Sequence, residues 1–278
     1  MKRDDHSGEL RRIAKRGDPD RYASALFAPS NVRPHLFALI AFNVELARIA
    51  EQVSEPQLGE IRLQWWRDAL PRAMAGETIS HPVVDAVGRA ASERALSKHL
   101  LDALVDAREF DVSVKIMPDM AALETYLDAT AGGLFRLAAE LLEGRVDEAT
   151  SSAAQSAGLA YGLTGLMRAL PLHVRRGRID LPSDLLRKHG VRLGDLLAGR
   201  NSEGLTSVLA ELRDRARSAR EEASRRIARL PKPGRAAFRP LALVKPYLSR
   251  LERTDPFGPV VELNPLHRLW LLGTWRPV

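Results

Sequence analysis

Three charged side chains in the first third of the chain are spaced so that they could act together. Glu45, Arg48 and Glu51 follow one another at three-residue steps, so on a helix they share one face and can form ion pairs. Such a cluster could bind a polar ligand inside the protein. It could equally be an internal salt-bridge network, because ion-paired groups are often purely structural. The spacing favours the structural interpretation.

A second group of candidates, four arginines around a histidine, lies in the second half of the chain. The arginines are Arg168, Arg175, Arg176 and Arg178. Their guanidinium forks could hold a phosphate, or they could stabilise the C-terminal end of their helix, where cations are favoured. A catalytic or metal-binding role for His173 would need a partner, and the sequence shows no nearby carboxylate or second histidine. We therefore expect no catalytic residue here.

These candidates lie in segments whose patterns predict α-helices. Ala, Leu and Arg are abundant, aromatic residues make up only 5%, and strand-forming residues are scarce, which favours helix. Phe37, Ile40, Ala41 and Val44 form one apolar stripe at helical spacing. After a first helix start at Asp18, we expect helices over residues 33–53, 57–75, from 82, 93–111, 121–142, 148–174, 193–198, 204–230 and 235–253. The predicted fold class is all-α.

No segment divides the chain convincingly into several domains. Its 278 residues, 45% hydrophobic and 28% charged, suit one large globular domain. We expect a flexible N-terminus over residues 1–17, a single domain over 18–254 and a C-terminal tail over 255–278. The tail is rich in Pro and Trp and carries an apolar run from Leu269 to Leu272. It should therefore pack on the domain or on a partner.

Composition excludes several classes of function. There are no cysteines, which excludes disulfides, thiolate zinc sites and cysteine nucleophiles. The N-terminus lacks the apolar core of a signal peptide, and no apolar run approaches the about 18 residues of a membrane-spanning helix, so we expect a cytoplasmic protein. A net charge of +7 suits an anionic membrane surface or substrate, or a merely solvated basic surface. Nucleic acid is disfavoured, because no aromatic-flanked basic platform is present.

Several short motifs together point to a known family. Leu39–Phe42 opens the helix that carries the first charged cluster, His81–Val84 reads HPVV, and Gly158–Pro182 reads GLAYGLTGLMRALPLHVRRGRIDLP. With Tyr126 on a helix between them, these motifs resemble the squalene/phytoene synthase family over residues 20–250. The resemblance implies a single-domain, isoprenoid-synthase-type helical bundle around a central cavity, and no sheet.

The same resemblance identifies where the family binds metal. Its active members carry aspartates at four-residue spacing on two facing helices, where they hold Mg²⁺ against a diphosphate and permit its ionisation. The corresponding positions here are Ala47, Glu51, Ala169 and His173. Only Glu51 remains a carboxylate, so magnesium-dependent ionisation should fail. We expect no catalytic residue, no metal and no cofactor, with Mg²⁺ needed only if the chain is an active enzyme.

The resemblance also places other side chains around the cavity. The candidates for lining it or binding a ligand are Glu45, Arg48, Glu51, Tyr126, Thr130, Gly162, Arg168, His173 and Arg178. Gly132, Gly133, Gly162 and Gly165 fall inside predicted helices, where each glycine costs about 1 kcal/mol relative to alanine. Close helix crossing or room for an apolar ligand would explain them, and the sequence does not separate the two.

The region around the first motif resembles one subgroup of the family in particular. Phe42–Arg48 and Arg62–Trp66 are similar to proteins related to a mitochondrial assembly factor of respiratory complex I, whose aspartate motifs are likewise degenerate. This implies a non-catalytic assembly or prenyl/lipid-binding factor, with a complex I subunit or assembly intermediate as partner. One alternative is an active prenyltransferase that condenses two prenyl diphosphates. Another is a basic protein bound peripherally to an anionic membrane surface, such as the inner membrane.

Overall fold

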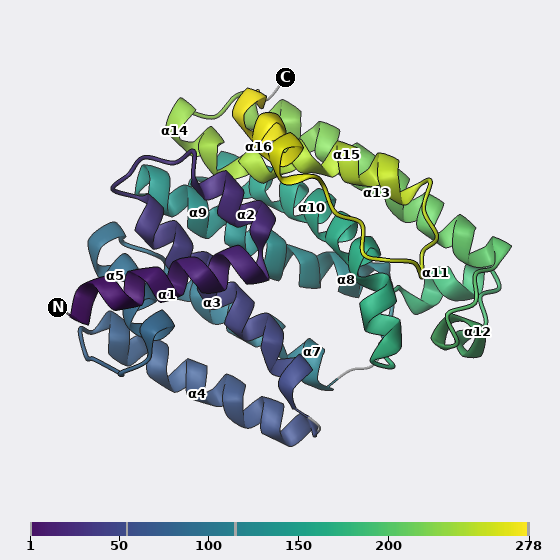
Figure 1. Ribbon diagram of the computed structural model, residues 1–278, viewed down its shortest axis with the longest axis horizontal. Helices are drawn as coiled ribbons and strands as arrows, with labels where there is room; N and C mark the ends of the chain where they lie inside the picture. The colour runs from purple at the N-terminus through teal and green to yellow at the C-terminus, as the bar shows by residue number, and fades with distance from the viewer. Residues whose placement is uncertain (1, 54, 114–115, 277–278) are drawn as a thin grey trace.

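The computed structural model describes residues 2–53, 55–113 and 116–276, and it confirms the all-α prediction (Figure 1). Within these residues the only β-type pairing is an isolated parallel bridge between Ile116 and Ile179. The helices of the N-terminal part are α1 Lys2–Gly17, α2 Pro19–Ala25, α3 Arg33–Gln52, α4 Pro56–Met74, α5 Pro82–Arg94, α6 Lys98–Ala107 and α7 Glu109–Ser113. Those of the middle are α8 Met120–Leu127, the π-helical turn η1 Asp128–Gly132, α9 Gly133–Glu143 and α10 Glu148–Arg175. Those of the C-terminal part are α11 Ser183–Lys188, α12 Leu193–Leu197, α13 Glu203–Ile227, α14 Lys232–Arg235, the 3-10 helix η2 Ala236–Leu243, α15 Val244–Leu251 and α16 Pro265–Thr274.

Several helices begin at capping side chains or prolines that can be recognised in the sequence. The side chains of Asp18, Asp147 and Ser202 accept hydrogen bonds from backbone N–H groups three residues on, at 2.9, 2.7 and 3.1 Å. Prolines occupy the first turn of α3, α4 and α5, where a missing N–H costs nothing. These caps fix where α2, α10 and α13 begin, and hence the direction of the helices that surround the centre of the bundle.

Two apolar cores meet at α9. The first core is formed mainly by α1, α3, α4, α5 and α6, and the second by α8, α10, α13 and the helices that follow. Helix α9 contributes Leu134 and Leu137 to the first core and Phe135 and Ala139 to the second. Because one amphipathic helix is shared, the two halves of the chain form one body (Figure 1).

The N-terminal segment differs from the sequence expectation. Residues 2–17 form α1, which packs along α3, in place of the flexible segment expected over residues 1–17. Leu10 and Ala14 are buried, and with Ile13 they recur at the three- and four-residue spacing of a packed helix face. This short apolar stripe indicates a packed helix, but it is easily overlooked in a segment that is otherwise polar. Residue 1 lies outside the described part of the chain.

Three expected helices are interrupted. The segment 93–111 is divided by Ala95, whose φ of 52° ends α5 in the left-handed region. The segment 121–142 contains the π-helical turn η1, and 235–253 consists of α14, η2 and α15. Pro240 lies inside η2, and its missing N–H is compatible with a tighter 3-10 turn.

The C-terminal tail folds back onto the body of the protein and contains α16. Leu263 and Leu272 are buried together with Ala23, Leu243 and Tyr247. The helix α16 therefore joins the end of the chain to α2, near its beginning (Figure 1). Within the described residues, no helix is both long enough and apolar enough to cross a membrane.

Candidate functional site

A cavity of about 730 Å³ lies between the two halves of the bundle. Its walls come from α3, α7, α8, η1 and α10, and from the segment that follows α10. All four positions at which the resemblance predicts metal ligands line it: Ala47, Glu51, Ala169 and His173. Of the other candidates, Tyr126, Thr130, Gly162 and Arg178 also line it. The cavity is thus where the resemblance placed it.

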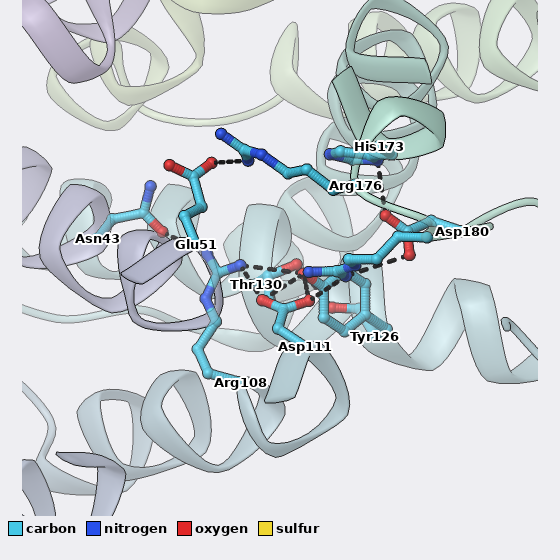
Figure 2. Close-up of polar contacts among 10 residues, drawn as sticks. Asn43, Glu51, Arg108, Asp111, Tyr126, Thr130, His173, Arg176 and Asp180 are labelled. Carbon is cyan, nitrogen blue, oxygen red and sulfur yellow. Dashed lines mark hydrogen bonds and ion pairs between the residues drawn. The ribbon is translucent and has the colours of Figure 1, made fainter. Parts of the chain in front are cut away.

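A buried hydrogen-bond network forms one wall of this cavity (Figure 2). Arg108, at the end of α6, donates to Asp111 at 2.9 Å, to the hydroxyl of Tyr126 at 2.9 Å and to Asn43 at 2.8 Å. The Tyr126 hydroxyl in turn donates to Asp111 at 3.0 Å. Burial, and then the charge of Asp111, raise the pKa of Tyr126, so the phenol stays neutral. The network ties α3, α6, α7 and α8 together.

The network continues through the segment after α10. Arg178 donates to both Asp111 and Asp180 at 3.1 Å, and Asp180 pairs with Nδ1 of His173 at 2.6 Å. The segment is held in place by the bridge at Ile179, whose carbonyl accepts from the N–H of Met117 at 3.1 Å. Figure 2 shows the side-chain contacts that run from Asp111 to Asp180 and His173.

The pKa of Asp180 follows from these partners. Burial alone would raise it, but the hydrogen bonds and charges of His173 and Arg178 outweigh burial and lower it. The expectation that His173 has no carboxylate partner was therefore wrong. Asp180 is seven residues further along the chain, and the turn after α10 brings it back beside the histidine.

The three charged residues of α3 do not share one environment. Glu51 pairs with Arg176 at 2.5 Å across the cavity, both side chains being 44% exposed. Glu45 pairs with Arg48 at 3.8 Å, and neither residue lines the cavity. The expected three-residue ladder is therefore not formed, because the long side chain of Arg176 reaches Glu51 from the end of α10.

Arg168 belongs to a different cluster from the one expected. Its guanidinium pairs with the buried Asp20 at 3.1 Å, donates to the carbonyl of Val261 at 3.0 Å and lies 3.7 Å from the ring centre of Tyr247. It does not line the cavity. Arg168 instead fastens the C-terminal segment to α2 and α10.

The helix glycines lie in different surroundings. A Cβ on Gly158 would lie 2.5 Å from the backbone N of Gly132, so α10 and η1 cross closely there. Gly162 faces Leu127. A Cβ on Gly165 would meet nothing within 4 Å, and Gly165 lines the cavity. Gly132 and Gly158 therefore serve packing, and Gly165 leaves room.

The residues present do not fit a magnesium site. Hard cations require several oxygen ligands that are free to bind, whereas Asp111, Asp180 and Glu51 are each bound to a guanidinium. Within the described ranges, no group of three His, Asp or Glu side chains could hold a metal ion. Of the carboxylates that line the cavity, these three are held in ion pairs, and the fourth, Glu55, is exposed to solvent.

Sequence reasoning missed Arg108, Asp111, Asp180 and the role of Asn43. Arg108 and Asp111 are three residues apart, a spacing that allows ion pairing on a helix. Asp180 lies two residues after Arg178 within the long motif that carries the resemblance. These were the available signals, but only the tertiary structure joins them to Tyr126 and His173.

The helical bundle and its central cavity define the class of this protein. The sequence model of the squalene/phytoene synthase family matches residues 14–268, and the chain belongs to this family. A squalene synthase, HpnC from Alicyclobacillus acidocaldarius, shares the fold with a TM-score of 0.79 at 21% identity; the match covers 91% of this chain and 95% of that one.

Two curated relatives are more similar in sequence. The complex I assembly factor 6 of NADH dehydrogenase (ubiquinone) from Rattus norvegicus is 31% identical, over 91% of this chain and 75% of that protein. The corresponding Homo sapiens protein is 29% identical, over 95% of this chain and 80% of that protein. The suspected family and the likeness to this subgroup are thus both confirmed.

Proposed function

We propose that the chain is a non-catalytic member of its family and acts as an assembly factor for respiratory complex I. The observation that carries the proposal is the pairing of the cavity's charges. Every arginine that lines the cavity has a carboxylate partner: Arg21 with Asp18, Arg108 with Asp111, Arg176 with Glu51, and Arg178 with Asp111 and Asp180. A metal–diphosphate complex would have to displace these pairs. The names of the rat and human relatives support the role in assembly.

The side chains that α3 and α10 turn toward the cavity also support the proposal that the chain is non-catalytic. Ala47 on α3 and Ala169 on α10 both line the cavity, and a methyl side chain cannot bind a cation. Glu51, the one carboxylate at the corresponding positions, is bound to Arg176. A metal that neutralises the developing negative charge of an allylic diphosphate needs carboxylates to hold it, and these positions offer only Glu51.

The cavity remains suited to a prenyl or lipid-like ligand. Phe110, Leu127, Leu134 and Leu166 contribute apolar surface to its walls. The network around Arg108 and Tyr126 offers polar groups at one side for a hydrogen-bonding head group. A ligand held in this way would stabilise the fold during assembly without being converted.

The absence of catalysis is tested with Mg²⁺ and farnesyl or geranylgeranyl diphosphate. We expect no release of inorganic diphosphate above the protein-free rate. Turnover that disappears in Glu51→Ala would show that the site still ionises its substrate and would overturn the proposal. Glu60→Ala is a matched control, because Glu60 is an exposed glutamate on α4 that does not line the cavity.

The assembly role is tested by deleting the gene in its own host. We expect NADH–quinone oxidoreductase activity and the amount of assembled complex I to fall, with carotenoid, hopanoid or sterol products unchanged. Expression of the wild-type gene should restore both. The opposite phenotype, lost isoprenoid products with normal complex I, would favour an active prenyltransferase that condenses two prenyl diphosphates.

The net charge of +7 favours a second candidate function, peripheral binding to an anionic membrane surface such as the inner membrane. Long-range attraction to anionic lipids weakens as salt screens it. Flotation with anionic vesicles that is lost at high salt would support this function, and no flotation at low salt would contradict it.

A further inference from the structure

The C-terminal helix α16 exposes apolar side chains to solvent on one face. Leu266, Leu269 and Trp270 are 78%, 37% and 61% exposed, whereas Arg268 and Leu272 on the other face are buried. The exposed positions follow a spacing of three and four residues, which places them on one side of the helix. Burying the inner face against the body thus leaves a second apolar face without a partner in the described structure.

A side chain from the N-terminal part of the chain extends this face. Phe27, which follows α2, is 41% exposed, and its ring lies 3.3 Å from where a Cβ on Gly273 would be. We call Phe27, Leu266, Leu269 and Trp270 together the α16 ridge. Its parts come from both ends of the sequence, so it exists only when the tail is folded onto α2.

Positive charge lies beside the α16 ridge. Trp270 also lines a groove of about 670 Å³ between α13, α15 and α16, together with Arg220, Lys245 and Arg276. Among the described residues, none of these three cations forms an ion pair with a carboxylate. Of the described residues that line the groove, only Glu221 has a carboxylate side chain, and α16 itself contains no Asp or Glu. The groove therefore carries net positive charge next to exposed apolar surface.

We infer that the α16 ridge inserts into the interface of a bilayer that contains anionic lipids. This inference deepens the second proposed function and rests on it. Trp and Leu side chains next to cations match the boundary between head groups and acyl chains, where indole rings and cations are both favoured. Four partly exposed side chains offer less than the about 800 Å² that each partner contributes to a standard protein–protein interface. A lipid surface is therefore the better fit.

The inference is tested by flotation of the full chain with phosphatidylcholine vesicles, with and without phosphatidylglycerol. We expect the wild type to float with the anionic vesicles at low salt. The double variant Leu266→Ser, Trp270→Ala should have a partition coefficient into anionic vesicles at least about tenfold lower than that of the wild type. Burial of one large apolar side chain already contributes about a factor of ten to such a coefficient. Lys245→Gln combined with Arg220→Gln should weaken binding to anionic vesicles and not change binding to neutral ones.

A matched control distinguishes the ridge from exposed apolar surface in general. Leu58 and Ile61 on α4 are 47% and 66% exposed and lie outside the ridge, so Leu58→Ser combined with Ile61→Ser should float like the wild type. Circular dichroism and the thermal midpoint check that each variant is folded. Equal flotation of the wild type and the ridge variant would refute the assignment to α16 while leaving membrane binding intact. No flotation of the wild type would refute both, and neither result bears on the assembly function.

Discussion

At the scale of single residues, Asp111 is the centre of the cavity's network. It accepts hydrogen bonds from Arg108, Arg178 and Tyr126, and 8% of its side chain is exposed. Burying a carboxylate is expensive unless its charge is matched and its lone pairs are occupied, and here both conditions are met by three elements of the bundle. The same contacts that offset the cost also leave Asp111 with little capacity to bind a metal ion.

Asp180 gives a prediction about pH at this scale. Its pKa lies below the usual 3.8, so its ion pairs stabilise the fold above that pH, and the stabilisation is lost as the pH falls through the folded-state pKa. Asp180→Asn should lower the free energy of unfolding by about 1–3 kcal/mol at neutral pH. Urea unfolding of both proteins should show this difference at neutral pH and a smaller one below about pH 4. A difference that grows in acid would contradict the assignment.

Which residues line the cavity was predictable only in part. The positions 47, 51, 169 and 173 could be read from a motif, because helical spacing sets which side chains share a face. The contact between Asp180 and His173 could not be predicted from helical spacing. The contact depends on the path of a loop after α10, and no periodicity describes a loop.

At the scale of elements, the crossing of α10 with η1 sets the width of the cavity. Gly158 allows the two backbones to approach closely, and Gly165, two turns further along α10, leaves space beside the cavity. Small residues thus permit close helix packing at Gly158 and leave open space at Gly165 on the same helix. The π-helical turn η1 lies at this crossing, as is common for such turns near functional sites.

Two alanine substitutions in α10 should therefore have opposite effects. Gly158→Ala should lower the free energy of unfolding by about 1–3 kcal/mol, because its Cβ would lie 2.5 Å from the backbone of Gly132. Gly165→Ala should be neutral or stabilise by up to about 1 kcal/mol, because alanine favours helix and its Cβ has room. Urea unfolding of the two variants measures both effects. Equal destabilisation would show that the helices are not packed more closely at Gly158 than at Gly165.

Helix starts were easier to predict than helix interruptions. Asp18, Asp147 and Ser202 carry the side chains that cap a helix, and such caps depend on neighbouring residues alone. The ending of α5 at Ala95 and the turn η1 were not predicted. Alanine has no local preference for a left-handed backbone, so the conformation of Ala95 is imposed by the packing of α5 and α6 on other helices.

At the scale of the whole molecule, Asp20 links the two ends of the chain. It is buried and pairs with Arg168 of α10 at 3.1 Å, Arg268 of α16 at 2.7 Å and the hydroxyl of Tyr247 in α15 at 3.0 Å. One carboxylate near the N-terminus thus holds α10 from the middle of the chain and the C-terminal helices α15 and α16. The family resemblance predicted the bundle as a whole, but this connection depends on contacts more than 140 residues apart in sequence that no local pattern contains.

Removal of this carboxylate should loosen the C-terminal region. Asp20→Ala should lower the free energy of unfolding by about 3–5 kcal/mol, because it leaves two guanidinium groups without their buried partner. Asp214→Ala is the matched control, since Asp214 is 71% exposed in its pair with Arg217 and its loss should cost less than about 1 kcal/mol. Thermal unfolding measures both, and limited proteolysis should cut the Asp20 variant near α16 first. Equal stability of the two variants would contradict the proposed link.

The paired charges of the cavity also restrict the mutational paths that remain open to this protein. Under the proposed function, new aspartates at positions 47 and 169 would face a cavity whose arginines are already bound to carboxylates. An added aspartate would find no free arginine to pair with, and a bound metal would need further ligands besides it. No single step would then gain activity while keeping stability. Under the proposed function, a return to diphosphate chemistry would therefore require several changes together, at the metal-binding positions and among the arginines.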